Sequence, residues 1–139
     1  MIDKVDLVMW TKNGSETLHL VLKRITEVIP KEFVNNHIII DDHSTDDTRQ
    51  IAKSFGWQVI FNEGSGISDG ANTALKHVES EYFISLEQDL LLARDWWKKI
   101  PLFLENPKVA TASGMRFADK PRGVRKLQQY VAKKYRGES

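Results

Sequence analysis

Short, almost continuous apolar runs alternate with segments of helical periodicity along most of the chain. The runs are rich in Val, Ile, Phe and Tyr, a composition typical of strands buried on both faces of a parallel sheet. They occupy residues 5–10, 37–40, 58–61, 82–86 and 109–112. We therefore expect each run to form a strand of one sheet.

The segments between these runs carry apolar residues at helical spacing. Their apolar stripes lie within residues 18–29, 51–55, 71–78 and 96–100. Ser44 and Asp47 have the spacing of a capping box for the second helix, and Ser68 is the expected cap of the third. Gly56 is expected to end the second helix and Pro101 to split the fourth.

Regular alternation of strands and helices predicts an α/β domain with a mainly parallel sheet and right-handed crossovers. In open sheets of this kind, ligands bind beyond the carboxyl ends of the strands. The residues at these predicted ends are Thr11–Gly14, Asp41–Ser44, Asn62–Gly66 and Glu87–Asp89. The candidate chemistry is therefore expected on one edge of the sheet.

Carboxylates dominate the ends of the second and fourth strands. Asp41 and Asp42 either bind a ligand or mark the start of the following helix, where acids favour the helix dipole. Glu87 and Asp89 are two residues apart, which places both side chains on one side of an extended chain. They could share a metal or a ribose, or form an exposed turn. Oxygen ligands of this kind suit Mg²⁺ or Mn²⁺, and such an ion can hold a diphosphate.

Two further features lie near these acids. The loop Glu63–Gly66 could bring backbone N–H groups close to a phosphate, although a flexible turn has the same composition, and the P-loop and dinucleotide-binding spacings are absent. His43 stands within the acidic turn and could touch a ligand. The other histidines are expected to be structural.

Charge and composition narrow the function classes. The chain has 20 basic and 19 acidic residues, a balance that offers no overall attraction to nucleic acid. It has no cysteine, which excludes disulfides and thiolate metal sites. No signal peptide or membrane-spanning run is visible. We expect a cytoplasmic location, and membrane association of a longer protein stays open.

In order and spacing, these motifs resemble those of family 2 glycosyltransferases. The most specific block is Asp41-Asp42-His43-Ser44-Thr45-Asp46-Asp47-Thr48, after an apolar strand. The first strand with its Thr11-Lys12-Asn13 turn, the glycine-containing loop with its helix, and the strand that ends in Glu87-Gln88-Asp89 follow the family's arrangement. The resemblance covers about residues 4–115 and implies a GT-A (Rossmann-like) α/β/α sandwich.

The resemblance also implies a role for each matching residue. Thr11 would line the base pocket, and Asp42 would accept a hydrogen bond from the base, typically uracil N3–H. Asp41 would lie beside it or near the ribose. Glu87 would meet the ribose, and Asp89 would bind a divalent cation, Mn²⁺ or Mg²⁺, that bridges the diphosphate.

The implied reaction is transfer of a sugar, with inversion, from a nucleotide-diphosphate sugar to an acceptor. A UDP-sugar is favoured, and the acceptor is a glycan, a lipid or a protein. The sequence departs from the family at Glu87, where an aspartate is usual, near Ala71, where an arginine is usual, and at Lys12 and Asn13, which supply no stacking aromatic. Glu87 and the missing arginine favour the alternative of a non-catalytic nucleotide-sugar-binding or interaction domain, whereas Asp42 and Asp89 argue against it.

By this resemblance, residues 1–115 form the nucleotide-sugar-binding half. Residues 116–139 are a basic tail, expected to begin a missing acceptor-binding half. No catalytic base is found, since Asp119 is the only acid between Pro107 and Glu138 and lies among basic residues. Apolar residues at helical spacing in the tail, from Val124 to Tyr135, could instead pair two chains in a dimer.

Two other α/β classes fit less well. A response-regulator receiver needs acids after its first strand and a phosphorylatable aspartate after its third, but these strands end in Trp10-Thr11 and Phe61-Asn62. A sugar nucleotidyltransferase needs an early glycine-rich loop with Arg or Lys, which residues 11–17 do not provide.

Overall fold

The computed structural model describes residues 4–109, 111 and 112. The chain divides into two compact units between Trp97 and Lys98. The first unit contains β1 (Val5–Thr11), α1 (Leu18–Val28), the 3₁₀ helix η1 (Lys31–Phe33), β2 (Val34–Asp41), α2 (Thr48–Ser54), β3 (Gln58–Phe61), α3 (Gly66–Leu75) and β4 (Phe83–Glu87). The short helix α4 (Trp96–Lys99) spans the division, and the 3₁₀ helix η2 (Pro101–Glu105) belongs to the second unit.

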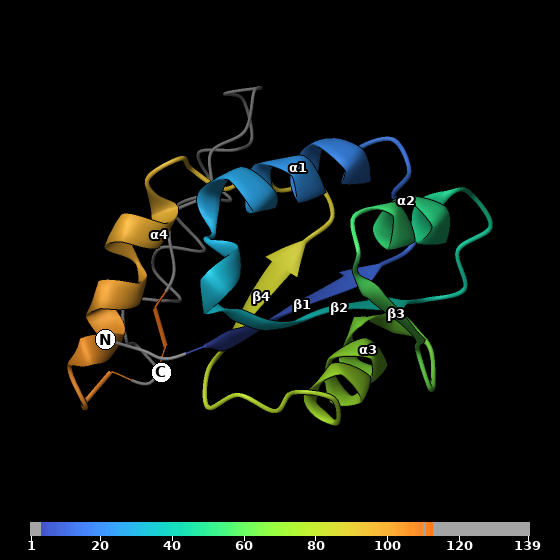
Figure 1. The fold of residues 1–139 in the computed structure, drawn as a ribbon. Helices are drawn as coiled ribbons and strands as arrows, with labels where there is room; N and C mark the ends of the chain where they lie inside the picture. Colours follow the sequence, from blue (N-terminus) through green and yellow to red (C-terminus); the bar gives the residue numbers. More distant parts are fainter. Residues whose placement is uncertain (1–3, 110, 113–139) are drawn as a thin grey trace, which may run out of the picture. The chain divides into compact units, whose positions relative to one another are not determined.

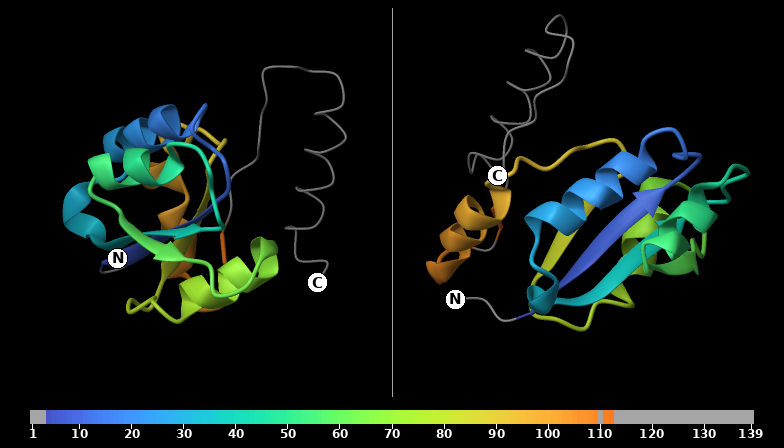
Figure 2. Two further views of the ribbon diagram at one scale, coloured as in Figure 1. Left: turned by 90° about the vertical axis from the view of Figure 1, so that its right-hand side faces the viewer. Right: turned by 45° about the horizontal axis from the view of Figure 1, so that its top comes forward.

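The four strands form one parallel sheet in the order β3-β2-β1-β4. Helices α1 and α2 cover one face of the sheet and α3 lies on the other (Figure 1). The two further views in Figure 2 show the same placement of the helices on opposite faces of the sheet. The predicted α/β/α sandwich with a parallel sheet is therefore confirmed.

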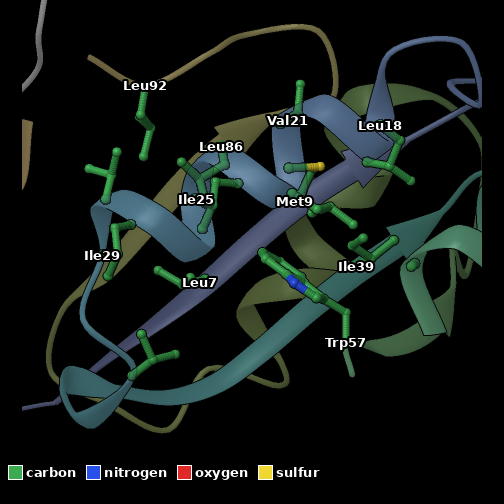
Figure 3. Close-up of a cluster of buried hydrophobic side chains, with 14 of the residues drawn as sticks. Leu7, Met9, Leu18, Val21, Ile25, Ile29, Ile39, Trp57, Leu86 and Leu92 are labelled. Atoms are coloured by element: carbon green, nitrogen blue, oxygen red, sulfur yellow. The ribbon is translucent and has the colours of Figure 1, made fainter. Parts of the chain in front are cut away.

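Alternating side chains of β1 enter the two halves of the core. Leu7 and Met9 are buried against α1, in a cluster that also holds Trp57 (Figure 3). Val8 points to the opposite face, where it packs in a second cluster with Ala74 of α3. Full burial of one such side chain contributes about 1.5–3 kcal/mol. A central strand covered on both faces explains the unbroken apolar run in the sequence.

The strand register brings the carboxyl ends of β1, β2 and β4 to a common edge. Thr11 pairs with Asp41 across β1 and β2, and Trp10 pairs with Glu87 across β1 and β4. The loops that follow these strands therefore gather at one rim, where ligands bind in open parallel sheets.

The prediction of a strand at residues 109–112 is wrong for its described members. Val109, Thr111 and Ala112 lie outside any strand. The chain turns here instead, because the Val109 N–H donates to the Asn106 carbonyl at 2.9 Å. Within the described residues the sheet has four strands.

Helix ends confirm some predictions and correct others. Gly56, at φ +82°, follows the end of α2, and the fourth helical segment is split at Pro101, where η2 begins, as predicted. The capping box is wrong, because α2 starts at Thr48 and its N-cap makes no side-chain hydrogen bond. Ser68 is not a cap either, since α3 already begins at Gly66.

Several predictions fall outside the described residues. These are the boundary between residues 115 and 116, the basic tail with its dimer face, and Asp119. In the part of the chain that the structure describes, no helix is long and apolar enough to cross a membrane. The cytoplasmic location stays a prediction.

Candidate functional site

The loop after β1 is fixed by side chains from two other segments. Four consecutive backbone N–H groups, those of residues 12–15, each donate to a side-chain oxygen. The pairs are Lys12 with Gln88 Oε1 (2.9 Å), Asn13 with Ser44 Oγ (2.9 Å), Gly14 with Thr48 Oγ1 (2.9 Å) and Ser15 with Asp46 Oδ2 (3.1 Å). We call residues 12–15 the clasped loop. Its position is set jointly by the β2–α2 loop and by the turn after β4.

Asp46 is the charged member of this arrangement. A hydrogen bond from the Thr48 hydroxyl is the largest of the effects that hold the pKa of Asp46 well below its usual range, and the N–H groups of Thr48 and Ser15 add to it. Partial burial acts in the opposite direction. Asp46 is therefore a carboxylate throughout the physiological pH range and accepts the Ser15 N–H as an anion. The sequence did not reveal this role, because the acidic block after β2 was interpreted as a ligand-binding site or as the start of a helix.

Thr11 and Asp41 are fully buried at the paired ends of β1 and β2. The Thr11 hydroxyl donates to Asp41 Oδ1 at 3.2 Å, and the Ser44 N–H donates to Asp41 Oδ2 at 3.1 Å. A buried carboxylate is costly unless donors replace the lost water, and these two groups supply them. Both side chains thus tie the strand ends to the adjoining loop.

Asp42 is 2 % exposed and joins the end of β2 to the loop before α3. Its Oδ1 accepts from the Asn62 side-chain amide at 3.2 Å and its Oδ2 accepts from the Gly66 N–H at 3.1 Å. His43 lies over this link, with Nε2 at 3.2 Å from the Gly64 carbonyl oxygen and 3.9 Å from Asp42 Oδ1. The His43 side chain itself is exposed.

The glycine-containing loop does not present free N–H groups to a phosphate. All four N–H groups of Glu63–Gly66 donate within the protein: Glu63 to Thr73 Oγ1 (3.2 Å), Gly64 to Asn62 Oδ1 (3.3 Å), Ser65 to Asp69 Oδ2 (2.9 Å) and Gly66 to Asp42 Oδ2 (3.1 Å). Of the two readings left open for this loop, the turn therefore fits the structure better, because oxygens of the chain itself occupy these four donors.

A cavity of about 440 Å³ opens beside α3 and the carboxyl ends of β1 and β4. Trp10, Ala71, Glu87 and Asp89 line it, together with apolar side chains of α3 and β4. Asp89 is exposed and Glu87 is half-buried. Among the described residues that line the cavity, these two are the acids and none is basic. Both acids of the last predicted motif therefore line one space.

Trp10 and Gly70 form one wall of this cavity. A Cβ atom on Gly70 would lie 2.3 Å from Trp10 Cδ1, so the indole approaches α3 where only a glycine leaves room. The indole Nε1 is buried and has no hydrogen-bond partner within the described part of the chain. The sequence offered one signal for this wall, a glycine inside a helical pattern.

The structure thus separates the predicted site residues into two groups. Glu87 and Asp89 line the cavity, whereas Thr11, Asp41 and Asp42 are buried beside it. No group of three or more His, Cys, Asp or Glu side chains that could hold a metal occurs in residues 4–109, 111 and 112. The roles of the five residues toward a nucleotide and a metal stay predictions.

With the fold and this rim in place, comparison with known proteins identifies the class. The sequence pattern of the family described as "Glycosyl transferase family 2" matches residues 6–138. The chain therefore belongs to glycosyl transferase family 2, as the motifs indicated.

Relatives with known names come from bacteria and archaea. The chain is 35 % identical over 95 residues to the poly(ribitol-phosphate) beta-N-acetylglucosaminyltransferase TarP of Staphylococcus aureus. The matched stretch covers 64 % of this chain and 29 % of TarP. The mannosyltransferase PcManGT of Pyrobaculum calidifontis, solved with GDP-Man and Mn²⁺, superposes with a TM-score of 0.69 at 23 % identity, over 78 % of this chain and 36 % of that one. S. aureus TarS residues 1–349, solved with UDP-GlcNAc, gives a TM-score of 0.65 at 24 % identity, over 73 % and 31 %.

These structures establish that the chain shares the GT-A fold. The chain spans less than a third of the length of TarP and about a third of each solved relative.

Proposed function

We propose that this chain is the donor-binding part of a glycosyltransferase, and that it holds a nucleotide-diphosphate sugar at the rim formed by β1, β2 and β4. The observation that carries the proposal is the cavity that Glu87 and Asp89 share at the carboxyl end of β4, in the stretch whose sequence resembles the family's acidic motif. Glu87 would hold the ribose. Thr11, Asp41 and Asp42 would form the base end.

The cavity fits a divalent cation that is shared with the ligand. Its described lining carries two carboxylates and no basic side chain, so no side chain in this part of the lining would offset the charge of a diphosphate. Asp89 would hold the cation, with water and the diphosphate oxygens completing its coordination, a mode usual for Mg²⁺. When bound, the cation would neutralise the charge that develops on the departing diphosphate. The relative solved with GDP-Man also contains Mn²⁺, which supports this assignment.

The base end depends on the buried carboxylates. Each oxygen of Asp42 accepts one hydrogen bond from the protein and can accept another, so a base N–H can be added once the covering His43 moves aside. A carboxylate accepts from the ring N–H of uracil, guanine or thymine alike. We favour a uridine nucleotide on the family resemblance.

In the transfer reaction, these residues bind and orient the donor. Inversion requires a base that deprotonates the acceptor hydroxyl on the opposite face of the sugar. We assign no such base among the described residues, and the acceptor, whether glycan, lipid or protein, is also left unassigned.

A panel of UDP, GDP and dTDP, titrated by calorimetry in the presence of Mn²⁺, tests the donor assignment. We expect UDP to bind most tightly. Tighter binding of GDP would move the assignment to guanosine donors, and failure of all three to bind at millimolar concentration would refute the proposed function.

The alternative, a non-catalytic nucleotide-sugar-binding or interaction domain, rests on the family departures at Glu87 and Ala71. Slow hydrolysis of a UDP-sugar with Mn²⁺ separates the two. We expect release of UDP that Asp89→Asn abolishes. Binding without any release from the parent chain would favour the binding domain.

A further inference from the structure

One side chain connects the turn that carries the two acids to the clasped loop. Gln88 Oε1 accepts the Lys12 N–H at 2.9 Å, and Gln88 Nε2 donates to the Lys12 carbonyl at 3.2 Å. The last backbone pair of these strands is Trp10 with Glu87. The Gln88 amide therefore extends the link between the two segments beyond the end of the sheet.

The backbone of Gln88 is held as well. The Thr17 hydroxyl donates to the Gln88 carbonyl at 2.8 Å, just before α1 begins. Gln88 thus has a fixed main chain and a fixed side chain, and it lies directly between Glu87 and Asp89. A shift of Gln88 would move both neighbouring acids.

Gly14 makes room for this contact. A Cβ atom there would lie 2.4 Å from Gln88 Oε1 and 2.7 Å from Gln88 Cδ, the carbon of the side-chain amide. The atoms that it would meet are the far end of a flexible side chain, which can rotate away. An alanine at this position should therefore displace the Gln88 amide while leaving the fold intact.

We propose that Gln88 is a positioning residue that fixes Glu87 and Asp89 relative to the clasped loop. The metal end of the donor site would thereby keep a set distance from the base end, beside Thr11. This inference rests on the proposed function. Gln88 also lines the cavity, but both polar atoms of its amide bond to Lys12, so it acts through its neighbours. Loss of the outer partners of metal ligands typically weakens metal binding about 10–100-fold.

The test measures how strongly Mn²⁺ increases the affinity for UDP, by calorimetry with Mn²⁺ and with EDTA, in the whole chain. We expect Gln88→Ala to lower this factor about tenfold or more, and to leave metal-free uridine affinity unchanged, because the Asp42 contacts are separate. Gly14→Ala should lower the factor in the same way. Gln50→Ala, an exposed glutamine in α2, is the matched control and should change nothing.

The double variant distinguishes a shared mechanism from general damage. If both changes act through the same amide, Gln88→Ala with Gly14→Ala should be no worse than Gln88→Ala alone. Additive losses, or an unchanged Mn²⁺ factor in Gln88→Ala with only a lower melting temperature, would overturn the positioning role and leave the proposed function standing. A parent chain in which Mn²⁺ has no effect on UDP would overturn both.

Discussion

At the scale of single residues, Asp6 is a fully buried carboxylate near the start of β1 that needs hydrogen-bond donors in place of water. Its Oδ1 accepts the Asn36 N–H at 3.0 Å, and its Oδ2 accepts the N–H groups of Glu79 at 2.6 Å and Ser80 at 3.0 Å. It therefore joins β1 to β2 and to the segment before β4, away from the candidate site.

We predict that Asp6→Asn lowers the free energy of unfolding by about 1–3 kcal/mol, because an amide NH₂ would face backbone N–H donors that need an acceptor. Denaturant titration measures the change. Asp47→Asn, at an exposed aspartate, is the control and should be close to neutral. Equal stability of the Asp6→Asn chain and the parent would contradict this view of Asp6.

The lowered pKa of Asp6 also determines how the free energy of unfolding should change with pH. Burial raises the pKa of Asp6, but hydrogen bonds from the N–H groups of Ser80 and Glu79 and from the side chains of Ser80 and Asn35 together outweigh burial and hold the pKa below its usual value. A carboxyl group whose pKa is lower in the folded state stabilises fully above its unfolded pKa, about 3.9, and loses this contribution as the pH falls through the folded value. Unfolding followed from pH 7 to pH 2 should show a smaller acid-induced loss in Asp6→Asn.

Gly70 lies where a side chain would collide with the Trp10 ring. We predict that Gly70→Ala destabilises the chain by about 1–3 kcal/mol, although alanine favours helices, because its Cβ would lie 2.3 Å from the rigid Trp10 ring. Thermal unfolding with near-ultraviolet circular dichroism measures both stability and the indole environment. Asn72→Ala, at an exposed position of α3, should be neutral or stabilising. A stabilised Gly70→Ala chain would show that the indole does not need this space.

At the scale of elements, the clasped loop explains why the block from Asp41 to Thr48 is so polar. Thr48 accepts from the Gly14 N–H and donates to Asp46, while Asp46 accepts from the Ser15 N–H. The residues that resemble a nucleotide motif therefore also order the loop beside the site.

We predict that Thr48→Val, which keeps the shape but removes the hydroxyl, speeds hydrogen exchange at Gly14 and Ser15 by about tenfold or more, the equivalent of at least about 1.4 kcal/mol of lost protection. Exchange followed by NMR at each amide provides the measurement. Thr26→Val, on the exposed side of α1, is the control and should leave these two amides unchanged. Unchanged exchange in Thr48→Val would mean that the clasp does not limit opening of the loop.

Sequence patterns predicted the strands and helices of the first unit well, because burial on both faces of β1 and β2 leaves unbroken apolar runs. They failed where long-range contacts decide the outcome. Ser44 has the spacing of a cap, yet its hydroxyl accepts from Asn13, which is 31 residues away. Likewise, nothing local shows that Gln88 reaches Lys12. Glu87 and Asp89 do line one cavity, but the reason expected from an extended chain is wrong. β4 ends at Glu87, and Asp89 lies in a turn in which the Leu90 N–H donates to the Glu87 carbonyl at 3.3 Å.

At the scale of the whole molecule, the charge of the cavity determines how a ligand would be held. Two acids and no basic residue line its described part, although the chain as a whole is nearly neutral. Like charges at close range repel, so a diphosphate should bind poorly on its own. Binding of a nucleoside diphosphate should therefore depend on a metal ion, and this dependence distinguishes a donor site from an acidic surface feature.

Calorimetry of uridine and UDP, each with Mn²⁺ and with EDTA, tests this claim most directly in the parent chain and in Asp89→Asn. In the parent, Mn²⁺ should strengthen UDP binding about tenfold or more and leave uridine unchanged, and by linkage UDP should strengthen Mn²⁺ binding by the same factor. In Asp89→Asn the UDP gain should disappear while uridine affinity persists. If the parent binds UDP equally well with EDTA and with Mn²⁺, the metal-assisted donor site is contradicted.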